Sequence, residues 1–284
     1  MMHLFFGFIF SAVAAVVSYN LWAGRKIEGL KGSLRGGSAL YQEGKSGRAC
    51  LLVHGFIGSV TDYGRLPELL HARGWTVDVP LLPGHGRDPQ ELSCVKLADY
   101  FALIEERFKK LRAKHSCVVL GGFSLGGTLT LALAERLKPD GLMLFAPYLQ
   151  IKQEWYYGLP VETWAGILAR WVPWIYRPEA FKQLFKKDRA AEIVDYPYFP
   201  LSCIKPLSEA GRSARQASLA ASLPVLILHS RKDRAVDFAA TAAFARRHPG
   251  AEFAELEHSN HLIFWDHDAG IVEEKILAWL KRFE

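Results

Sequence analysis

The chain has 284 residues, 50% of them hydrophobic, so it can bury a full core and is not a disordered protein. Its length fits one large α/β domain with room for an added segment. The net charge of +6 is modest and, without an aromatic or motif context, does not indicate a nucleic-acid-binding protein. The four cysteines are widely spaced with no C-x-x-C pair, so neither a disulfide framework nor a zinc site is indicated.

The N-terminus carries an unbroken apolar run. Residues 4–24 contain no charged side chain, and about 20 apolar residues are needed for a helix to cross a bilayer. We therefore expect residues 1–24 to form a transmembrane-type helix that anchors the protein, with membrane association through residues 4–24. A signal peptide is the alternative, although no basic residue precedes the run and no clear A-x-A cleavage site follows it.

The charges that flank this run predict its orientation. Basic residues lie on its C-terminal side, at Arg25, Lys26, Lys31 and Arg35. By the positive-inside rule the rest of the chain lies on the cytoplasmic side of the membrane, whereas signal cleavage gives a secreted or periplasmic protein. Residues 25–48, rich in glycine and serine, are expected to form a juxtamembrane connector with a short strand near residues 39–42.

From residue 49 onward, short apolar runs alternate with amphipathic stretches, which predict strands and helices respectively. The expected strands are 49–54, 75–80, a central run that starts at 117, 141–146, 225–229 and 252–256. The expected helices are 66–73, 97–114, 128–137, a helix around 238–247, and 271–283. This alternation predicts one α/β domain over residues 49–284, with a mostly parallel sheet and helices on both faces.

The alternation is interrupted between about residues 148 and 206, which we expect to form a largely helical cap inserted into the domain. This segment holds Trp155, Trp164, Trp171 and Trp174, four of the eight tryptophans. Tryptophans there can pack a small helical subdomain or line an apolar pocket. It also holds a basic cluster, which is either a solvated face or a surface toward anionic headgroups. The cluster comprises Arg170, Arg177, Lys182, Lys186, Lys187 and Arg189.

A serine flanked by glycines follows the central run. Gly122-Phe123-Ser124-Leu125-Gly126 matches G-x-S-x-G, with a predicted strand before it and a predicted helix after it. In this setting the serine lies on a sharp turn at the end of the sheet, and the glycines let the helix pack close to the strand. Ser124 is therefore the candidate nucleophile.

A serine hydroxyl needs a base to activate it, and the base needs a carboxylate to orient it. After such a turn, the acid and then the histidine follow along the chain. Asp233, in the loop after the predicted strand 225–229, is the candidate acid, while Asp237 is expected to cap the next helix. His261, in the loop after the last strand, is the candidate base, and His258 is the alternative.

Acyl transfer also needs hydrogen-bond donors for a developing oxyanion. The backbone N–H of Leu125 at the helix start and that of Phe56 in the loop after the first buried strand are the candidates. His54 and His85 lie next to glycines in loops, and we expect them to shape those loops rather than to react.

Taken together, these motifs resemble the α/β-hydrolase family over about residues 49–283, and within it the bacterial carboxylesterase and monoacylglycerol lipase group. The resemblance implies an α/β-hydrolase fold with a cap, and it implies the same roles for Ser124, Asp233, His261, Phe56 and Leu125. The Trp-rich cap departs from the family's pattern. The motifs that carry the resemblance are His54-Gly55-Phe56, Pro83-Gly84-His85-Gly86, Gly122-Phe123-Ser124-Leu125-Gly126, Asp233-Arg234-Ala235-Val236 and Ser259-Asn260-His261.

The expected activity is that of a serine hydrolase, a carboxylesterase or lipase, acting through an acyl-enzyme on Ser124. Its expected substrates are monoacylglycerol-like, lysophospholipid-like or short- and medium-chain acyl esters. A thioesterase or an acyltransferase is the alternative enzyme, because the chemistry of the three residues is shared. A binding or scaffold protein on the same fold is the non-enzymatic alternative. The sequence points to no metal, no cofactor and no nucleic-acid partner.

Overall fold

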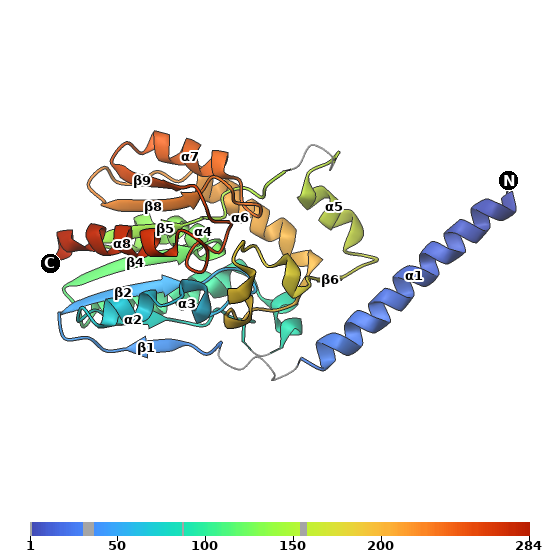
Figure 1. Ribbon diagram of the computed structural model, residues 1–284, viewed down its shortest axis with the longest axis horizontal. Helices are drawn as coiled ribbons and strands as arrows, with labels where there is room; N and C mark the ends of the chain where they lie inside the picture. The colour runs from blue at the N-terminus through green and yellow to red at the C-terminus, as the bar shows by residue number, and fades with distance from the viewer. Residues whose placement is uncertain (1, 31–36, 87, 154–157) are drawn as a thin grey trace.

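In the described part of the chain, seven strands form one sheet in the order β1-β3-β2-β4-β5-β8-β9 (Figure 1). The computed structural model describes residues 2–30, 37–86, 88–153 and 158–284, and for residues 2–10 and 12 it describes the backbone alone. The strands are β1 (Leu40–Gln42), β2 (Arg48–Val53), β3 (Thr76–Val79), β4 (Cys117–Phe123), β5 (Gly141–Phe145), β8 (Val225–Ser230) and β9 (Ala251–Leu256).

All neighbouring pairs in this sheet are parallel except β1 with β3. The strand β4 occupies the centre, paired with β2 on one side and β5 on the other. Its register runs from Cys117 opposite Arg48 to Gly122 opposite Val53, so β2 and β4 end at the same edge of the sheet. Loops that follow parallel strands meet at this edge, which is where open α/β sheets bind ligands.

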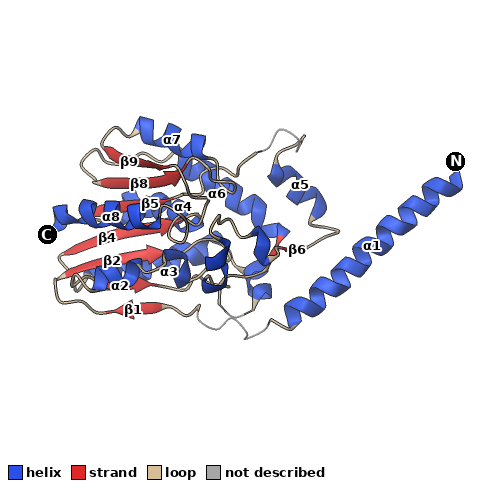
Figure 2. Cartoon of the chain, in the orientation of Figure 1, coloured by secondary structure: helices blue, strands red, loops and turns tan. Residues whose placement is uncertain are grey.

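Helices cover both faces of the sheet, which explains why its central strands are buried along nearly their whole length (Figure 2). One face packs on α2 (Leu66–His71) and α8 (Ala269–Leu280), the other on α3 (Leu97–Arg112), α4 (Leu125–Leu137) and α7 (Phe238–Arg247). Alternate residues of β2 serve the two cores: Cys50 and Leu52 join the first, and Leu51 and Val53 join the second. The predicted α/β-hydrolase fold with a mostly parallel sheet is confirmed.

Between β5 and β8 the chain forms a cap that is less helical than the sequence suggests. It contains α5 (Val161–Leu168), α6 (Ile204–Arg215) and an antiparallel pair, β6 (Trp174–Tyr176) with β7 (Tyr198–Pro200). Much of the rest consists of short 3₁₀ turns and segments that contain proline. A proline inside a helix removes a backbone hydrogen bond, so these segments do not form longer helices.

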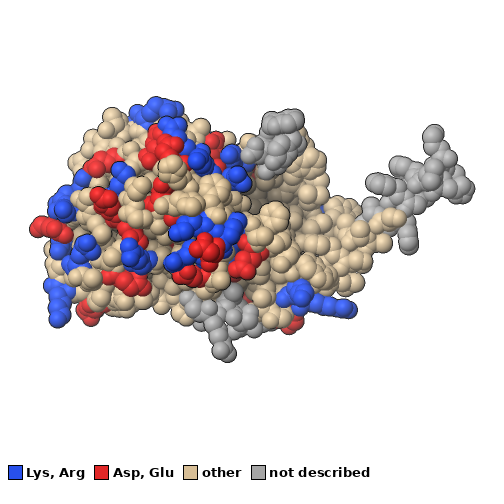
Figure 3. All heavy atoms as spheres, viewed as in Figure 1, with Lys and Arg blue, Asp and Glu red and all other residues tan. Residues whose placement is uncertain are grey.

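Several basic side chains of the cap bind other groups of the cap. The Lys182 ammonium is buried and donates to the carbonyls of Ala190 and Ile193 at 2.8 and 2.7 Å. Lys187 donates to two further carbonyls, and Arg177 pairs with Asp195. On the face shown in Figure 3, acidic and basic side chains are intermingled rather than gathered by sign. These contacts favour a structural role for much of the cluster.

The prediction of a transmembrane-type helix at the N-terminus is wrong. The helix α1 (Met2–Glu28) exists, but no helix in the described residues is long and apolar enough to cross a membrane. The predicted membrane-anchored localisation, with the catalytic domain on the cytoplasmic side, is overturned by the same finding. Hydropathy alone does not say what an apolar residue packs against. The C-terminal part of this helix packs on protein, because Ala23 and Ile27 are buried in one cluster with Tyr198.

The last turns of α1 are joined to the β6/β7 pair, while its N-terminal end projects away from the body (Figure 1). The Tyr19 hydroxyl donates to the carbonyl of Trp174 and accepts from the amide of Tyr176, both at 3.0 Å. The Trp22 ring packs edge-on against Tyr176, with ring centres 5.4 Å apart. The helix therefore supports the cap from outside the α/β body.

Candidate active site

The turn between β4 and α4 holds Ser124 in a strained conformation, with φ 51° and ψ −115°. L-residues rarely adopt positive φ, so the surrounding structure must enforce it. A Cβ on Gly122 would lie 2.3 Å from the carbonyl oxygen of Gly126, and one on Gly126 would lie 1.8 Å from that of Val53. Only glycine fits at these two positions, and this close packing brings the start of α4 against the ends of β2 and β4.

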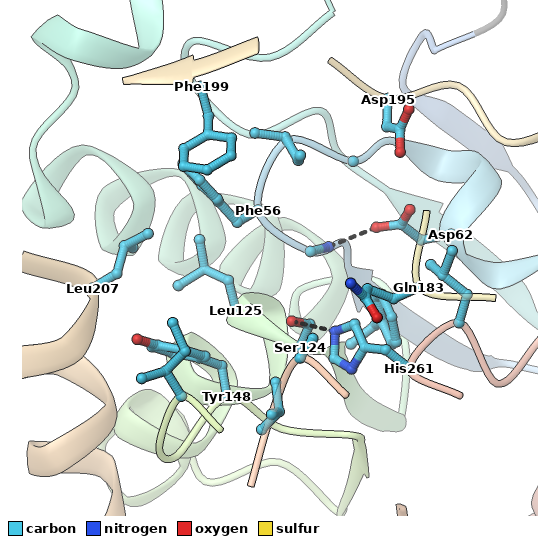
Figure 4. Close-up of a pocket in the computed structure, with 18 of the residues that line it drawn as sticks. Phe56, Asp62, Ser124, Leu125, Tyr148, Gln183, Asp195, Phe199, Leu207 and His261 are labelled. Carbon is cyan, nitrogen blue, oxygen red and sulfur yellow. Dashed lines mark hydrogen bonds between the residues drawn. The ribbon is translucent and has the colours of Figure 1, made fainter. Parts of the chain in front are cut away.

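The structure joins Ser124, His261 and Asp233 in one chain of hydrogen bonds. The Ser124 hydroxyl lies 2.9 Å from His261 Nε2 (Figure 4). On the other side of the ring, His261 Nδ1 lies 2.7 Å from Asp233 Oδ2. All three side chains are buried, with Asp233 1% exposed. With Nδ1–H donating to the carboxylate, Nε2 presents its lone pair to the serine hydroxyl, which is the arrangement a general base requires.

The loop after β8 fixes the Asp233 carboxylate. Its Oδ1 accepts from the amides of Ala235 and Val236 at 2.7 and 2.8 Å. Asp237, the alternative acid, instead accepts from the amide of Ala239 and caps α7, as the sequence indicates.

His258, the alternative base, is not part of this chain of hydrogen bonds. Its backbone amide donates to Asp268, and its side chain lines a separate surface hollow beside Lys232 and His267. The structure therefore brings His261, and not His258, to Ser124.

Two backbone N–H groups are available beside Ser124. Neither Phe56 nor Leu125 has a hydrogen-bond acceptor for its amide within the described chain, and both residues line the cavity at Ser124. The amide of Ile57, next to Phe56, is instead bound to His85 Nε2 at 3.1 Å, and Ile57 has a positive φ of 58°. This leaves the Phe56 amide as the free donor of its loop.

His54 and His85 shape the loops around this site, as predicted. His54 Nε2 accepts from the amide of Leu82 at 2.9 Å, and the two imidazole rings meet edge to face, 4.9 Å between centres. Burial lowers the pKa of His54 to about 3 and that of His85 to about 4. Both rings are therefore neutral and accept backbone N–H groups around the loop that carries Phe56.

A cavity of about 380 Å³ opens onto Ser124 and has two chemically different sides (Figure 4). Its volume falls within the usual range of small-molecule sites. Apolar side chains lie on one side of the serine, and polar ones lie on the other, nearer His261. The apolar side includes Phe56, Leu125, Tyr148, Phe199 and Leu207, and the polar side includes Asp62, Gln183 and Asp195.

Asp62 is a buried carboxylate at this site that sequence reasoning misses. Its Oδ2 accepts from the Gly55 amide at 2.8 Å, directly before Phe56, and the side chain is 2% exposed. Burial, reinforced by the charge of Asp195, raises the pKa of Asp62 to about 7 despite the opposing hydrogen bond from Gly55. The sequence contains no signal for this, because Asp62 belongs to no motif and its burial depends on tertiary packing.

We expect Asp62→Asn to remove a pH-dependent loss of stability. The Asp62 carboxyl has a pKa of about 4 in the unfolded chain and about 7 in the folded protein, so folding favours its protonated form. The resulting contribution to stability is complete below pH 4 and is lost as the pH rises through 7. The wild type should therefore lose up to about 4 kcal/mol relative to the variant between pH 4 and pH 8. Asparagine retains an oxygen for the Gly55 amide. Urea unfolding of both proteins at several pH values measures the difference, and a difference that stays constant with pH contradicts the expectation.

Asp233 Oδ2 also accepts from a second histidine, His229, whose Nε2 lies at 3.1 Å. Burial by itself raises the pKa of Asp233, but the charge of His261 and the hydrogen bonds from His229 and His261 outweigh it. They hold the pKa of this carboxyl well below its usual range, so Asp233 stays ionised. The sequence shows His229 only as the end of an apolar strand.

Comparison with known proteins places this site in a family. Residues 44–268 match the family described as serine aminopeptidase, S33, and this range contains Ser124, Asp233 and His261. A carboxylesterase from Bacillus subtilis (strain 168) is 22% identical over 241 residues, which cover 84% of this chain and 94% of the relative. A thermostable monoacylglycerol lipase from Bacillus sp. (strain H-257) is 39% identical over 90 residues, 32% of this chain and 36% of the relative.

A solved structure from work on LipS and LipT, two metagenome-derived lipolytic enzymes, superposes with a TM-score of 0.74 at 25% identity. The match covers 87% of this chain and 98% of the other. The comparisons confirm the predicted resemblance to carboxylesterases and monoacylglycerol lipases, and with it the predicted class of serine carboxylesterase or lipase. The chain belongs to the serine aminopeptidase S33 family and has the α/β-hydrolase fold.

Proposed function

We propose that this protein hydrolyses monoacylglycerol-like esters through an acyl-enzyme on Ser124. The observation that carries the proposal is the chain of hydrogen bonds from Ser124 through His261 to Asp233. Ser124 and His261 line a cavity that has one apolar and one polar side. A relative described as a monoacylglycerol lipase supports the substrate class.

In the proposed reaction His261 Nε2 takes the proton of the Ser124 hydroxyl as its oxygen attacks the ester carbonyl. The carbonyl oxygen becomes an oxyanion, which the free amides of Phe56 and Leu125 stabilise. His261 then protonates the leaving alcohol, and the acyl group stays on Ser124. A water molecule deprotonated by His261 then attacks this ester. His261 returns the proton to the Ser124 oxygen as the fatty acid leaves.

The cavity provides separate places for the two halves of such a substrate. The acyl chain fits the side lined by Phe199 and Leu207, where burial of apolar surface favours it. The alcohol half faces Asp62 and Gln183, whose oxygens accept hydrogen bonds from hydroxyl groups. A polyol ester should therefore be turned over faster than the methyl ester of the same acid.

A fluorophosphonate probe tests the chemistry, because it reacts with an activated serine. We expect the wild type to be labelled and Ser124→Ala to lose labelling and ester hydrolysis. Ser93→Ala, at an exposed serine in the 3₁₀ helix Pro89–Cys94, is the matched control and should react like the wild type. A wild type that stays unlabelled, or equal labelling of Ser124→Ala, would overturn the proposed mechanism.

The substrate is tested separately with monoacylglycerols, methyl esters and acyl-CoA thioesters that carry the same acyl chains. We expect the highest kcat/KM for a monoacylglycerol. Equal kcat/KM for the glycerol and methyl esters contradicts recognition of the alcohol, and faster thioester turnover favours a thioesterase.

A further inference from the structure

We propose that His229 is a positioning residue that donates a hydrogen bond to Asp233 and limits how much of the carboxylate's charge reaches His261. The proposal rests on the function proposed above. Its first support is that both histidines bind one oxygen: Asp233 Oδ2 lies 2.7 Å from His261 Nδ1 and 3.1 Å from His229 Nε2.

The surroundings of His229 determine its tautomer. Its side chain is 0% exposed, and its Nδ1 is buried with no hydrogen-bond partner in the described residues. A proton on Nδ1 would be a buried donor without an acceptor, and a second proton would add a buried charge, both of which are costly. The arrangement therefore favours a proton on Nε2, directed at Asp233.

The charged groups around His229 leave this arrangement intact. Lys152 donates from Nζ to the backbone carbonyl of Asp233 at 3.3 Å. The His229 ring packs edge-on against Phe238 of α7, whose ring in turn lies under the Arg231 guanidinium. Glu255, opposite His229 on β9, pairs with Arg231. The nearest charge partner of His229 is thus Asp233 itself.

The consequence for catalysis follows from sharing one oxygen. With Ala235 and Val236 on Oδ1 and the histidines on Oδ2, the carboxylate has four donors and cannot rotate without losing several of them. A donor on Oδ2 also reduces the negative charge available to an imidazolium at His261. Loss of the His229 donor is therefore expected to move the acid limb of the pH–rate profile to higher pH.

The test compares His229→Phe, which keeps a ring but removes the donor, with His229→Gln, which offers a donor at a similar reach. The readout is the second-order rate of fluorophosphonate labelling as a function of pH. We expect the acid-limb midpoint of His229→Phe to move up by about half to one pH unit. His229→Gln should return to the wild-type midpoint, whereas a role in packing alone would change the plateau rate and leave the midpoint in place.

An unchanged midpoint in both variants overturns the inference while leaving the proposed function intact, because the wild type is still labelled. A wild type that is never labelled overturns the proposed function and this inference with it. Should His229→Phe fail to fold, ¹⁵N NMR of histidine-labelled wild type decides the question. It should show His229 protonated on Nε2 alone, and protonation on Nδ1 would overturn the proposal.

Discussion

Replacing Asp233 with asparagine is expected to lower kcat by about ten-thousand-fold while the protein remains folded. The amide oxygen would stay with the N–H groups of Ala235 and Val236, because the amide nitrogen cannot accept from them. The nitrogen would then face His261 as a donor. His261 would have to present a lone pair on Nδ1, which places its proton on Nε2 toward Ser124, and it could no longer act as a base.

The matched control for this loss is Asp237→Asn in the same loop. Asp237 caps α7 through the amide of Ala239, and asparagine caps helices about as well as aspartate. We expect its kcat to stay near the wild-type value. Initial rates on a p-nitrophenyl ester, with circular dichroism to verify folding, measure both variants. A kcat for Asp233→Asn within tenfold of the wild type would show that Asp233 does not hold the tautomer of His261.

The second large effect is expected from Gly126→Ala at the start of α4. The added Cβ would lie 1.8 Å from the carbonyl oxygen of Val53 and 2.7 Å from that of His54, so backbone has to move. Steric conflicts of this kind in a core cost on the order of 4 kcal/mol or more. The same shift would displace Ser124, two residues before it, and thus also abolish labelling by a fluorophosphonate.

Gly270→Ala provides the comparison, since Gly270 also occupies the second position of a helix, α8. A Cβ there meets nothing within 4 Å, so the variant should be neutral or slightly more stable. Urea unfolding compares the free energies of unfolding of the three proteins. If Gly126→Ala unfolded at the same urea concentration as Gly270→Ala, the close contact between α4 and β2 would not be essential.

The arrangement of strands and helices could be predicted well because it depends on local patterns. The helix predicted around residues 238–247 is Phe238–Arg247, and the strand predicted at 225–229 ends one residue later. Ser124 could be proposed from the glycines that its turn requires, and Asp233 and His261 from their order and their places after strands. The structure brings the three together across 28 and 137 residues of sequence.

The residues that sequence reasoning missed depend on contacts between distant segments. His229 looks like the polar end of a buried strand, and Asp62 looks like an ordinary loop aspartate. Each becomes part of the site only when packing removes it from water and places it against Asp233 or Gly55. The cap is predicted as largely helical because the alternation of strands and helices stops there, and the sequence gives no sign of the β6/β7 pair.

The contact between α1 and the β6/β7 pair has a consequence for where this protein can be shortened. A hydrophobic N-terminal helix is often trimmed before expression, yet a chain that begins at Arg25 would lack Tyr19 and Trp22. The carbonyl of Trp174 and the amide of Tyr176 would lose their partner, and the Tyr198 ring would lose part of its cover. Phe199, the next residue of β7, lines the cavity at Ser124. Trimming this helix would therefore be expected to alter the apolar side of the cavity in the shorter protein.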